Sequence, residues 1–488
     1  MTRLAELYRP SLALLTDLYQ LTMAFGYFKT GAVRRDASFS LFFRHHPFNG
    51  GFTIACGLAT ALDFLEQFRF ELEDLDYLST LVGNDGEPLF DDHFLDYLRQ
   101  LRLECEVHAV PEGTVVFPYE PLIRVTGPLL QAQLLETALL NIVNFQSLVA
   151  TKAARICAAA QGDPVLEFGL RRAQGIDGGL TASRAAYIGG AEATSNVLAG
   201  RLYGIPVKGT HAHSWVMAFE DEEEAFVAYA AALPGNCVFL VDTYDTIEGV
   251  RNAIRVGQDL RQRGFEMVGV RLDSGDLAEL SKQARRMLDE AGFENAVIVG
   301  SNDLDEHAIT ELKRRGATIG VWGVGTRLVT GGDQAALGGV YKLGAVEDDE
   351  GKWQPRIKLS ERSIKTSIPG IQQVRRFFRD GSMVGDLIFS DLIGEPAAPR
   401  GETLRGDRID FGSTEALEFE DLLQPVIRSG ELVAKLPSLT DIRQRAIRQC
   451  NLLPDSITRI AEPKPYPVGL ELRLAEQRRQ LMVQSHST

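Results

Sequence analysis

The sequence has few cysteines, no closely spaced cysteine pair and no long uncharged apolar run. The five cysteines are scattered over 488 residues, at Cys56, Cys105, Cys157, Cys237 and Cys450. This spacing excludes a Cys-x-x-Cys zinc or redox site and a dense disulfide framework. The first ten residues contain no apolar segment of the kind found in a secretory signal, and polar residues interrupt every long apolar stretch. We therefore expect a cytoplasmic protein without a membrane segment.

Basic residues are also in short supply. The chain has 51 Lys and Arg against 66 Asp and Glu, a formal net charge of −15. An acidic protein of this kind disfavours non-specific binding to nucleic acid or anionic membranes, so we expect neither as a partner. The negative charge of an anionic substrate would have to be neutralised within the binding site, by a few arginines or lysines, backbone N–H groups or a divalent metal. The 45% hydrophobic content is typical of a globular protein, and the length predicts two or three domains.

The first part of the chain, residues 1–125, is predicted to form an α/β domain. Apolar residues at helical spacing predict a helix over 11–30, and alternation predicts a strand over 37–43. Further helices are expected near 57–68, 73–81 and 90–103. The β-branched residues and turn-forming prolines of 107–125 indicate β-structure.

The middle of the chain, residues 126–370, is predicted to form a (β/α) barrel. Short apolar, β-branched runs alternate with helix-like stretches, which is typical of βα units and a parallel sheet. The runs cover residues 165–170, 205–209, 237–241, 267–272, 296–300, 318–323 and 339–343. Seven strands, with room for one less obvious member, favour a barrel, and an open doubly wound sheet is the alternative. Residues 371–488 form a smaller C-terminal region, which we expect to pack back on the N-terminal domain and to end in a frayed polar tail after Leu474.

Polar clusters directly follow six of these predicted strands. They are Arg171-Arg172, Thr210-His211-Ala212-His213-Ser214, Asp242-Thr243-Tyr244-Asp245, Arg271-Leu272-Asp273-Ser274-Gly275-Asp276, Ser301-Asn302-Asp303 and Gly323-Val324-Gly325-Thr326-Arg327. In a β/α barrel the C-terminal strand ends converge on the face that carries the active site. We therefore expect these clusters to meet at one mouth.

The residue types at this mouth predict a phosphorylated sugar as substrate. Gly300-Ser301 and the Gly323–Thr326 turn would let backbone N–H groups approach a phosphate. Arg171 and Arg271 can each hold a phosphate or carboxylate with two hydrogen bonds. Asp242 and Asp273 would accept from an imidazolium or sugar hydroxyls, or bind Mg²⁺. Each cluster alone is more often structural, as a tight turn, an ion pair or a buried histidine, so the prediction rests on their convergence.

Several motifs, in the same order, resemble those of the nicotinate phosphoribosyltransferase family over residues 12–370. They are Leu15-Thr16-Asp17-Leu18-Tyr19-Gln20-Leu21-Thr22-Met23, Phe168-Gly169-Leu170-Arg171-Arg172-Ala173-Gln174-Gly175, Gly209-Thr210-His211-Ala212-His213-Ser214, Asp242-Thr243-Tyr244, Val270-Arg271-Leu272-Asp273-Ser274-Gly275-Asp276, Gly323-Val324-Gly325-Thr326 and Gly338-Gly339-Val340-Tyr341-Lys342-Leu343. The resemblance implies the irregular barrel of type II phosphoribosyltransferases. It also implies synthesis of nicotinate mononucleotide and pyrophosphate from nicotinate and phosphoribosyl pyrophosphate, in the salvage branch of NAD biosynthesis.

The resemblance further implies a role for each matching residue. His213 would be the histidine that ATP phosphorylates, with Asp242 holding its other ring nitrogen and Asp273 near the ribose and a Mg²⁺ or Mn²⁺ ion. The remaining implied residues bind nicotinate (Tyr19, Phe168, Thr210 and Arg271) or phosphoribosyl pyrophosphate (Arg171, Gly300, Ser301, Gly323, Gly325 and Thr326). Tyr19 would reach across the interface of a homodimer with shared active sites.

One departure concerns His211, since the family usually has an apolar residue at this position. Two histidines in one loop compete for the phosphorylated role, and the His213-Ser214 dipeptide favours His213. The rival enzymes are nicotinamide and quinolinate phosphoribosyltransferases. The amide-using family tends to carry a carboxylate near Ser195-Asn196, where this chain is uncharged. A catalytically silent protein on the same fold would have lost His213, Asp242 or Arg271. An unrelated sugar-phosphate barrel enzyme would lack the Tyr19 motif.

Overall fold

The structure is a computed structural model that describes residues 11–360 and 366–486. The first ten residues, for which the sequence predicts no secretory signal, lie outside the described residues. The described chain divides into two compact units. Unit 1 comprises residues up to Ser147, Ala336–Ser438 and Arg448 onward, and unit 2 comprises Leu148–Ala335 and Leu439–Ile447.

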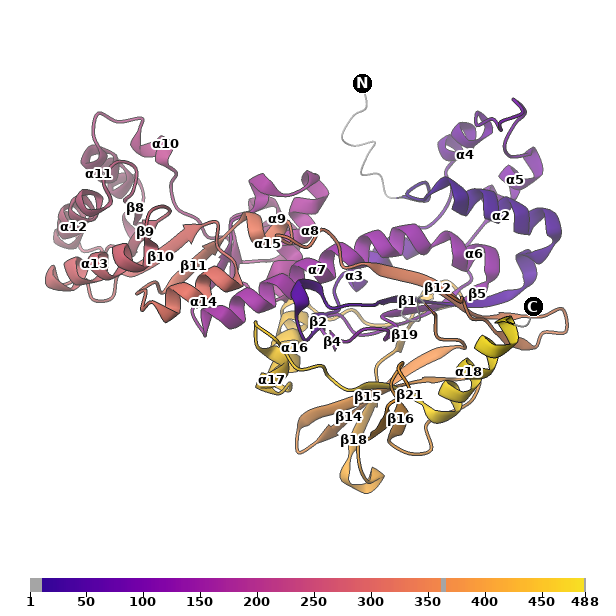
Figure 1. Ribbon diagram of the computed structural model, residues 1–488. Coiled ribbons are helices and arrows are strands. Elements are labelled where there is room, and N and C mark those ends of the chain that lie inside the picture. Colours follow the sequence, from indigo (N-terminus) through magenta and orange to yellow (C-terminus); the bar gives the residue numbers. More distant parts are fainter. Residues whose placement is uncertain (1–10, 361–365, 487–488) are drawn as a thin grey trace. The chain divides into compact units, whose positions relative to one another are not determined.

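Unit 1 is built on a seven-stranded sheet of order β13-β12-β1-β5-β3-β19-β20. Its strands are β1 (Asp36–Phe43), β3 (Glu106–Ala109), β5 (Ile123–Pro128), β12 (Gly339–Glu347), β13 (Trp353–Pro355), β19 (Gln424–Arg428) and β20 (Glu431–Leu432). The antiparallel neighbours of β1 are β5 and β12, which lie beside it in Figure 1. The strand predicted at 37–43 is therefore confirmed. Almost every residue of β1 is buried, so this strand lies inside the unit rather than at its surface.

A second, six-stranded sheet in unit 1 holds most of the C-terminal region, in the order β17-β16-β21-β15-β14-β18. Its strands are β14 (Gln372–Arg379), β15 (Ser382–Ser390), β16 (Arg400–Glu402), β17 (Arg408–Asp410), β18 (Glu418–Asp421) and β21 (Val468–Glu471), and β2 (Thr53–Ile54) pairs separately with β4 (Val115–Val116). The polar tail is not frayed as expected. It forms α18 (Leu472–His486), whose Leu474 and Ala475 are buried in the hydrophobic core of unit 1.

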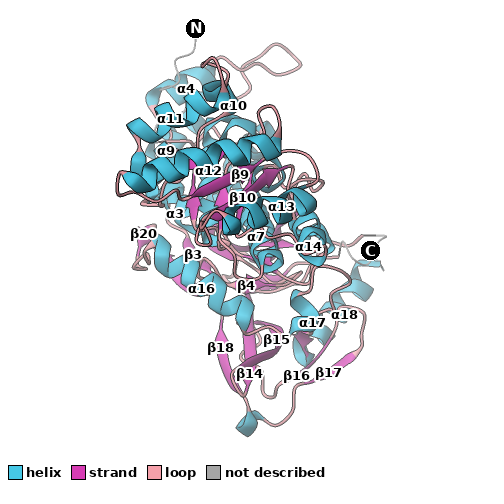
Figure 2. Ribbon diagram, turned by 90° about the vertical axis from the view of Figure 1, so that its left-hand side faces the viewer, coloured by secondary structure: helices cyan, strands magenta, loops and turns pink. Residues whose placement is uncertain are grey.

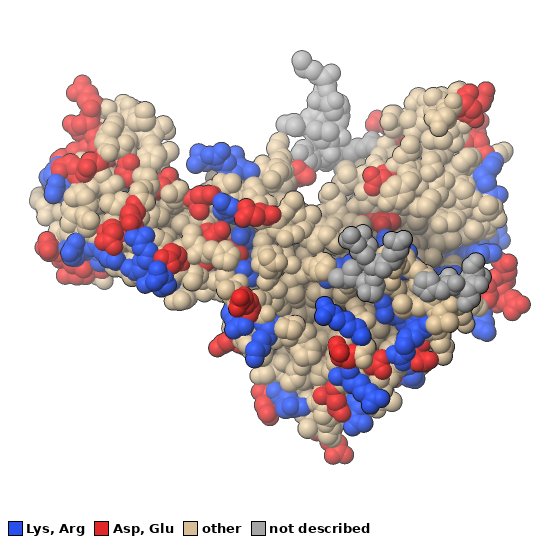
Figure 3. Space-filling model, in the orientation of Figure 1, with Lys and Arg blue, Asp and Glu red and all other residues tan. Residues whose placement is uncertain are grey.

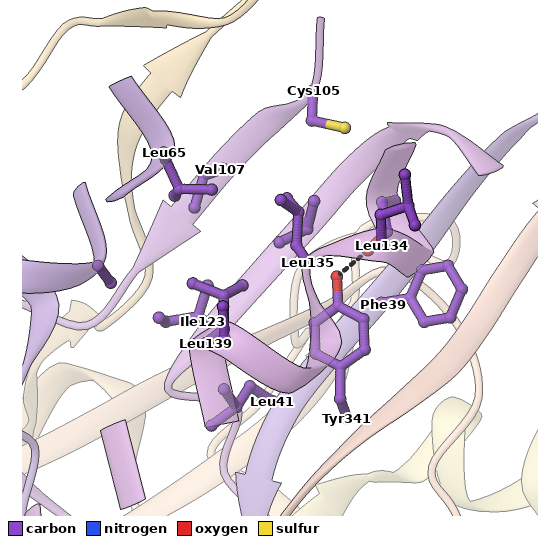
Figure 4. Packing of buried hydrophobic residues seen from close by; sticks show 14 of the residues in the cluster. Phe39, Leu41, Leu65, Cys105, Val107, Ile123, Leu134, Leu135, Leu139 and Tyr341 are labelled. Carbon is purple, nitrogen blue, oxygen red and sulfur yellow. Dashed lines mark hydrogen bonds between the residues drawn. The ribbon is translucent and has the colours of Figure 1, made fainter. Parts of the chain in front are cut away.

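The helices of unit 1 pack on these sheets. They are α2 (Leu18–Thr30), α3 (Leu58–Glu66), α4 (Leu72–Ser79), α5 (Asp92–Gln100), α6 (Leu129–Leu134), the first half of α7 (Glu136–Ala160), α17 (Asp455–Thr458) and α18. In the core, the ring of Phe39 stacks on Tyr341 at a centroid distance of 5.0 Å. The Tyr341 hydroxyl donates a hydrogen bond of 2.8 Å to the carbonyl oxygen of Ala132 in α6 (Figure 4). This pairing joins β1, β12 and α6, which explains why 339–343 belongs to unit 1.

Unit 2 contains a six-stranded parallel sheet of order β7-β6-β11-β10-β9-β8. Its strands are β6 (Val165–Glu167), β7 (Ala193–Thr194), β8 (Val238–Leu240), β9 (Gly269–Leu272), β10 (Val297–Asn302) and β11 (Val321–Val324). Its helices are the second half of α7, α8 (Gly175–Ile188), α9 (Val197–Tyr203), α10 (His213–Val216), α11 (Glu222–Ala232), α12 (Thr246–Gln262), α13 (Leu277–Glu290), α14 (Glu306–Arg314), α15 (Thr326–Val329) and the first part of α16 (Leu439–Asn451). Helices α12 and α13 lie against β9 and β10, as Figure 2 shows.

The parallel sheet and βα alternation predicted from the sequence are confirmed, with two corrections to the strand list. Residues 339–343, predicted as a parallel strand of the barrel, form the start of β12 and pair antiparallel with β1 in unit 1. The short strand β7 was not predicted. Within the described residues the backbone ladder is not closed, since β7 and β8 stand at its two ends. The segment 205–208 extends the β7 end through a parallel bridge between Thr194 and Val207.

The observed units also differ from the predicted boundaries of 1–125, 126–370 and 371–488. Unit 2 begins at Leu148, within α7, and its main segment ends at Ala335. The physical reason is that α6 packs on β1 and β5, while β12 pairs with β1, so the two ends of the predicted barrel segment belong to unit 1.

Acidic and basic side chains are mixed over the surface of unit 2 around α13 and α14 (Figure 3). Ion pairs such as Arg314–Glu311 at 2.7 Å and Arg315–Asp276 at 2.7 Å account for part of this pattern. Exposed pairs of this kind add little stability. Within the described part of the chain, none of the helices combines the length and the apolarity needed to cross a bilayer.

Candidate active site

A cavity of about 560 Å³ in unit 2 brings together many of the predicted residues. Those lining it are Phe168, Arg171, Thr210, His213, Arg271 and Asp273, together with residues such as Ser195, His211 and Leu240. Phe168, Asp273 and the loop around His213 follow buried parallel strands or strand-like segments, and Arg271 lies near the end of β9. Polar groups of both charges therefore converge at the C-terminal ends of the strands, as the sequence predicted.

Arg271 is held in place by three neighbours. Its Nε donates to Ser301 Oγ at 2.7 Å, its Nη1 to Thr210 Oγ1 at 3.0 Å and its Nη2 to Asp273 Oδ1 at 3.0 Å. The guanidinium carbon lies 5.6 Å from the centroid of the Phe168 ring. Because a guanidinium has about five N–H donors, these three bonds fix its orientation and leave two donors for a ligand.

Asp273 is the carboxylate of this group. Its Oδ1 also accepts a hydrogen bond of 2.5 Å from Ser301 Oγ. Burial alone would raise the pKa of Asp273, but the hydrogen bond from Ser301 and the positive charge of Arg271 outweigh burial and lower the pKa below its usual value. Asp273 is therefore ionised at neutral pH, which keeps the Arg271–Asp273 pair charged.

His213 is the first residue of the short helix α10 and faces the cavity. Its Nδ1 lies 3.1 Å from Thr243 Oγ1, and its Nε2 lies 3.8 Å from Asp273 Oδ2. Thr243 is a residue that the sequence reasoning missed. Its only signal was its place in the Asp242-Thr243-Tyr244 motif after β8.

The expected contact between Asp242 and His213 is not made by the described residues. Asp242 Oδ2 instead accepts hydrogen bonds from the Asp273 backbone N–H at 2.8 Å and from Ser274 Oγ at 2.6 Å. Its Oδ1 is buried without a hydrogen-bond partner among the described residues. The reason is that Asp242 and Thr243 are adjacent, so the backbone directs their side chains differently. Asp242 thus orders the turn that presents Asp273.

The glycines predicted to hold phosphate also have packing roles. A Cβ atom on Gly300 would lie 2.7 Å from Ile319 Cδ1, and one on Gly323 would lie 2.8 Å from Phe168 Cδ2. Ser301 is engaged with Arg271 and Asp273, as described above. Gly325 precedes α15, and Thr326 is exposed at its first residue. None of these five predicted phosphate-binding residues lines the 560 Å³ cavity.

Arg171 lines the cavity and is exposed. It follows β6 within a short 3₁₀ turn, Leu170–Arg172. No carboxylate among the described residues pairs with it. Its guanidinium is therefore available to an anion.

Glu167, at the end of β6, is a further residue that the sequence reasoning missed. It is fully buried, and its Oε2 accepts hydrogen bonds from Ser183 Oγ at 2.8 Å and Thr194 Oγ1 at 2.5 Å. Its Oε1 accepts from the backbone N–H of Gly169. These bonds fix the chain on both sides of Phe168. A charged residue within the apolar run Val165–Leu170 was the signal that could have found it.

Tyr19, predicted to contact nicotinate, lies on α2 in unit 1 and is 49% exposed. Two other apolar residues of the same helix, Leu18 and Met23, are also exposed, as is Leu15 shortly before the helix begins. All residues that line the cavity belong to unit 2, and Tyr19 is not among them.

A resident metal site built by the protein alone is not found in residues 11–360 and 366–486, where no group of three or more His, Cys, Asp or Glu side chains is arranged to hold an ion. The carboxylate oxygens nearest the cavity that remain without a hydrogen bond are Asp273 Oδ2 and the buried Asp242 Oδ1. Carboxylate oxygens are ligands that Mg²⁺ and Mn²⁺ accept, so Asp273, which lines the cavity, is a residue that could contribute to such a site.

Comparison with known proteins agrees with this geometry. Sequence models of the nicotinate phosphoribosyltransferase (NAPRTase) family match the chain as its N-terminal domain over residues 14–144, as the family itself over 165–382 and as its C-terminal domain over 371–478. Nicotinate phosphoribosyltransferase from Bacillus subtilis is 45% identical over 464 residues, covering 94% of this chain and 93% of its own. The Homo sapiens protein of the same name is 39% identical, covering 94% of this chain and 95% of its own.

Two solved structures extend the comparison. The crystal structure of human nicotinic acid phosphoribosyltransferase superposes with a TM-score of 0.83 at 36% identity, covering 96% of this chain and 99% of that one. Nicotinate-nucleotide pyrophosphorylase from Pyrococcus furiosus shares the fold, with a TM-score of 0.67 at 22% identity over 92% of this chain and 98% of its own. The expected fold class is thereby confirmed. The chain belongs to the nicotinate phosphoribosyltransferase family.

Proposed function

We propose that the protein joins nicotinate to the phosphoribosyl group of phosphoribosyl pyrophosphate, forming nicotinate mononucleotide and pyrophosphate in NAD biosynthesis. The observation that best supports this proposal is that three side-chain hydrogen bonds fix the Arg271 guanidinium at the cavity wall. The names of the relatives, which are nicotinate phosphoribosyltransferases, support the same activity.

The two free donors of Arg271 suit the carboxylate of nicotinate, because a guanidinium binds a carboxylate through two parallel hydrogen bonds. Phe168 offers a ring face to the pyridine beside this guanidinium. Ser195, an uncharged residue, lines the same cavity, and neighbouring Asn196 is engaged with Ser183 and the start of α9. At this part of the wall the described residues Ser195 and Asn196 offer no carboxylate to receive an amide N–H, which favours a carboxylate substrate over an amide.

The reaction requires little proton transfer. The bond between C1 of the ribose and the pyrophosphate oxygen breaks through an oxocarbenium-like transition state, and the pyridine nitrogen attacks C1 with its own lone pair. The protein therefore acts by positioning both substrates and stabilising the departing charge. Arg171 supplies a guanidinium without a carboxylate partner for the phosphates, and the Gly325-Thr326 turn would hold the 5′-phosphate, with Gly300, Ser301 and Gly323 shaping the wall behind them.

Mg²⁺ or Mn²⁺ would be held chiefly by the pyrophosphate oxygens, with Asp273 as the protein ligand. When bound, the ion would neutralise charge on the leaving group. Removal of divalent metal with EDTA should abolish turnover, and readdition of Mg²⁺ should restore it.

ATP coupling would pass through His213. If Nδ1–H donates to Thr243 Oγ1, Nε2 carries the lone pair. Attack of Nε2 on the γ-phosphorus of ATP would form the N–P bond, break the P–O bond to ADP and give a phosphohistidine. Asp273 Oδ2, at 3.8 Å from Nε2, would favour the cationic ring that forms.

The test of this coupling is phosphoryl incorporation from ATP labelled at the γ-position. The His213→Ala variant should incorporate none and should keep a slow, ATP-independent turnover of nicotinate. Full ATP stimulation in this variant would contradict the role of His213. Exposed His307 on α14 provides a matched control, since His307→Ala should incorporate phosphate normally.

We also propose a homodimer in which Tyr19 of one copy contacts nicotinate in the other. The exposed apolar face of α2 around Tyr19 supports an interface there. Mixing Tyr19→Ala with His213→Ala, which lacks ATP stimulation, should restore ATP-stimulated turnover, because each mixed dimer would hold one intact shared site. Lack of complementation in a sample that exchanges subunits would contradict shared sites.

The activity itself is tested by supplying nicotinate, phosphoribosyl pyrophosphate and Mg²⁺ and measuring nicotinate mononucleotide by chromatography. Product should form with the natural protein and fall at least a hundredfold with Arg271→Ala, because the carboxylate would lose both hydrogen bonds. Failure of the natural protein to form the product would overturn the proposal.

A further inference from the structure

We infer that His211 closes the barrel of unit 2 through its side chain and thereby positions Thr210 and His213, so that it is a positioning residue and not a second phosphorylated histidine. The inference rests on the proposed function, because it assigns His211 a task within the same site. The two strands at the ends of the parallel sheet are β7 and β8.

The chain that follows α9 extends the β7 end of the sheet. The Thr194 N–H donates to the Pro206 carbonyl oxygen at 3.0 Å, and the Lys208 N–H donates to the Thr194 carbonyl oxygen at 3.0 Å. These are the bonds of a short parallel ladder. Three residues later the same segment reaches His211.

At the opposite end of the sheet, β8 presents backbone groups on its outer edge. The Val241 N–H points inward to β9, where it donates to the Arg271 carbonyl oxygen at 3.2 Å. In a strand, neighbouring N–H groups alternate in direction, so the Leu240 N–H points away from β9. It donates to His211 Nε2 at 3.2 Å. An imidazole thus takes the place of the backbone carbonyl that a further strand would supply, and it joins the two ends.

The surroundings of His211 suit this role. The side chain is only 7% exposed and lies among three aromatic rings, those of Tyr229, Phe226 and Phe239, with centroid distances of 5.0, 5.9 and 6.5 Å. Burial lowers the pKa of His211 to about 4, and the positive charge of Arg271 acts in the same direction. The ring is therefore neutral at pH 7.

The hydrogen bonds also select a tautomer. Nε2 accepts from Leu240, so it carries the lone pair, and the proton lies on Nδ1, which is 3.4 Å from the Ala212 carbonyl oxygen. With its lone pair engaged by a backbone N–H, Nε2 is not available to attack a phosphoryl group. In contrast, the ring nitrogens of His213 face side chains, with Nδ1 3.1 Å from Thr243 Oγ1 and Nε2 3.8 Å from Asp273 Oδ2.

The residues on either side of His211 carry the proposed chemistry. The Thr210 hydroxyl accepts from Arg271 Nη1 and lies 3.2 Å from the His211 carbonyl oxygen. His213 lies two residues further along. Loss of the bond to Leu240 would free this segment from β8 and shift both side chains, and displacement of a reacting group by about 1 Å can slow a reaction up to about a hundredfold.

The experiment compares two variants at this position. His211→Gln places an oxygen acceptor at about the position of Nε2, whereas His211→Leu fills the aromatic surroundings but leaves the buried Leu240 N–H without an acceptor. We expect His211→Gln to keep phosphoryl incorporation and ATP-stimulated kcat within about twofold, and His211→Leu to lower both by about tenfold and to raise KM for nicotinate. The control His307→Gln should match the natural protein.

Two outcomes would overturn the inference. If His211→Leu behaves like the natural protein, the bond to Leu240 does not position the site. If His211→Gln loses phosphoryl incorporation as completely as His213→Ala, His211 takes part in the chemistry itself. A natural protein that incorporates no phosphate and makes no nicotinate mononucleotide would instead overturn the proposed function, which keeps the two failures distinct.

The tautomer provides a test that needs neither activity nor a stable leucine variant. In protein labelled with [¹⁵N]histidine, a long-range ¹H–¹⁵N spectrum distinguishes Nδ1–H from Nε2–H rings, and loss of a signal in His211→Gln assigns it. We expect His211 to be neutral and protonated on Nδ1 at pH 7. An Nε2–H ring or an imidazolium would contradict the closing bond.

Discussion

Arg271 and Asp273 form a direct ion pair at the end of β9, with Nη2 donating to Oδ1 at 3.0 Å. Ser301, at the end of the neighbouring strand β10, holds both side chains at once. The pair therefore has a fixed geometry that a substrate carboxylate can use. We expect the use of nicotinate to depend on this geometry and not on the charge of Arg271 alone.

Arg271→Lys should raise KM for nicotinate strongly while leaving the fold intact. A lysine ammonium keeps the charge but cannot bond Ser301, Thr210 and Asp273 while presenting two parallel donors to a carboxylate. We expect a loss of kcat/KM of about 2–3 kcal/mol, or roughly 30- to 150-fold. Steady-state kinetics with nicotinate measures it, and circular dichroism controls for folding. An unchanged kcat/KM would show that charge alone is enough.

Gly323→Ala should impair catalysis through Phe168. An added Cβ atom would lie 2.8 Å from Phe168 Cδ2 and 3.3 Å from Ser301 Cβ, so the ring must move away from its place beside Arg271. Overpacking of this kind costs about 1–3 kcal/mol. We expect a rise in KM for nicotinate. Gly320→Ala is the matched control, since nothing lies within 4 Å of its added Cβ atom. Equal kinetics for the two variants would contradict this use of Gly323.

Thr243→Val should weaken ATP stimulation specifically. Valine removes the hydroxyl that contacts His213 Nδ1 and keeps the shape of the side chain. We expect phosphoryl incorporation to fall about tenfold, because a lost hydrogen bond to a reacting ring costs roughly 1–1.5 kcal/mol, while ATP-independent turnover stays the same. Thr243→Ser keeps the hydroxyl group and should therefore retain most of the phosphoryl incorporation. If Thr243→Val leaves ATP stimulation unchanged, Thr243 does not orient His213.

Stability in unit 1 should depend on a buried cluster of Glu120, Arg376 and Asp386. Arg376 Nη2 lies 2.6 Å from Asp386 Oδ2 and 3.8 Å from Glu120 Oε2, and all three side chains are fully buried. Burial, and then the charge of Asp386, raise the pKa of Glu120 well above its ordinary value of 4.5. One arginine thus faces two carboxyl groups, and Glu120 keeps its proton to a higher pH than an exposed glutamate does.

The pH dependence follows from the direction of that shift. A group with a raised pKa in the folded state gives its full stabilisation below its unfolded pKa and loses it as pH rises toward the folded value. The unfolding free energy should therefore decline above about pH 4.5, and Glu120→Gln should remove this decline. Asp386→Asn should destabilise by about 3–5 kcal/mol, because it leaves a buried guanidinium without its partner. Urea unfolding from pH 5 to 9 measures both, and a decline that is undiminished in Glu120→Gln would contradict the raised pKa of Glu120.

Much of the site could be predicted from the sequence, because the polar residues follow short apolar runs and parallel strand ends converge. Arg171, Thr210, His213, Arg271 and Asp273 were placed together for this reason, whereas Phe168 was implied only by the family resemblance. The structure brings all six to one cavity. The convergence of parallel strand ends follows from the direction of the strands in the sheet, so it can be predicted without knowing any side-chain contact.

The finer contacts could not be predicted. Asp242 and Thr243 are adjacent and both are polar, and only the backbone direction after β8 decides that Thr243 faces His213 while Asp242 faces Asp273 and Ser274. The contacts of Glu167 could not be predicted from any periodic pattern in the sequence. The three groups that donate hydrogen bonds to its carboxylate belong to Gly169, Ser183 and Thr194. Similarly, the apolar run at 339–343 predicts a strand but not its sheet, which is decided by the fit of Tyr341 against Phe39 and α6.

The central claim is that nicotinate is the substrate of this cavity. The most direct measurement supplies nicotinate, nicotinamide and quinolinate separately at equal concentration, each with phosphoribosyl pyrophosphate and Mg²⁺, with and without ATP, and compares kcat/KM from product formation. The account predicts a clear preference for nicotinate, stronger turnover with ATP and a loss of that preference in Arg271→Lys. A preference for nicotinamide or quinolinate would contradict it.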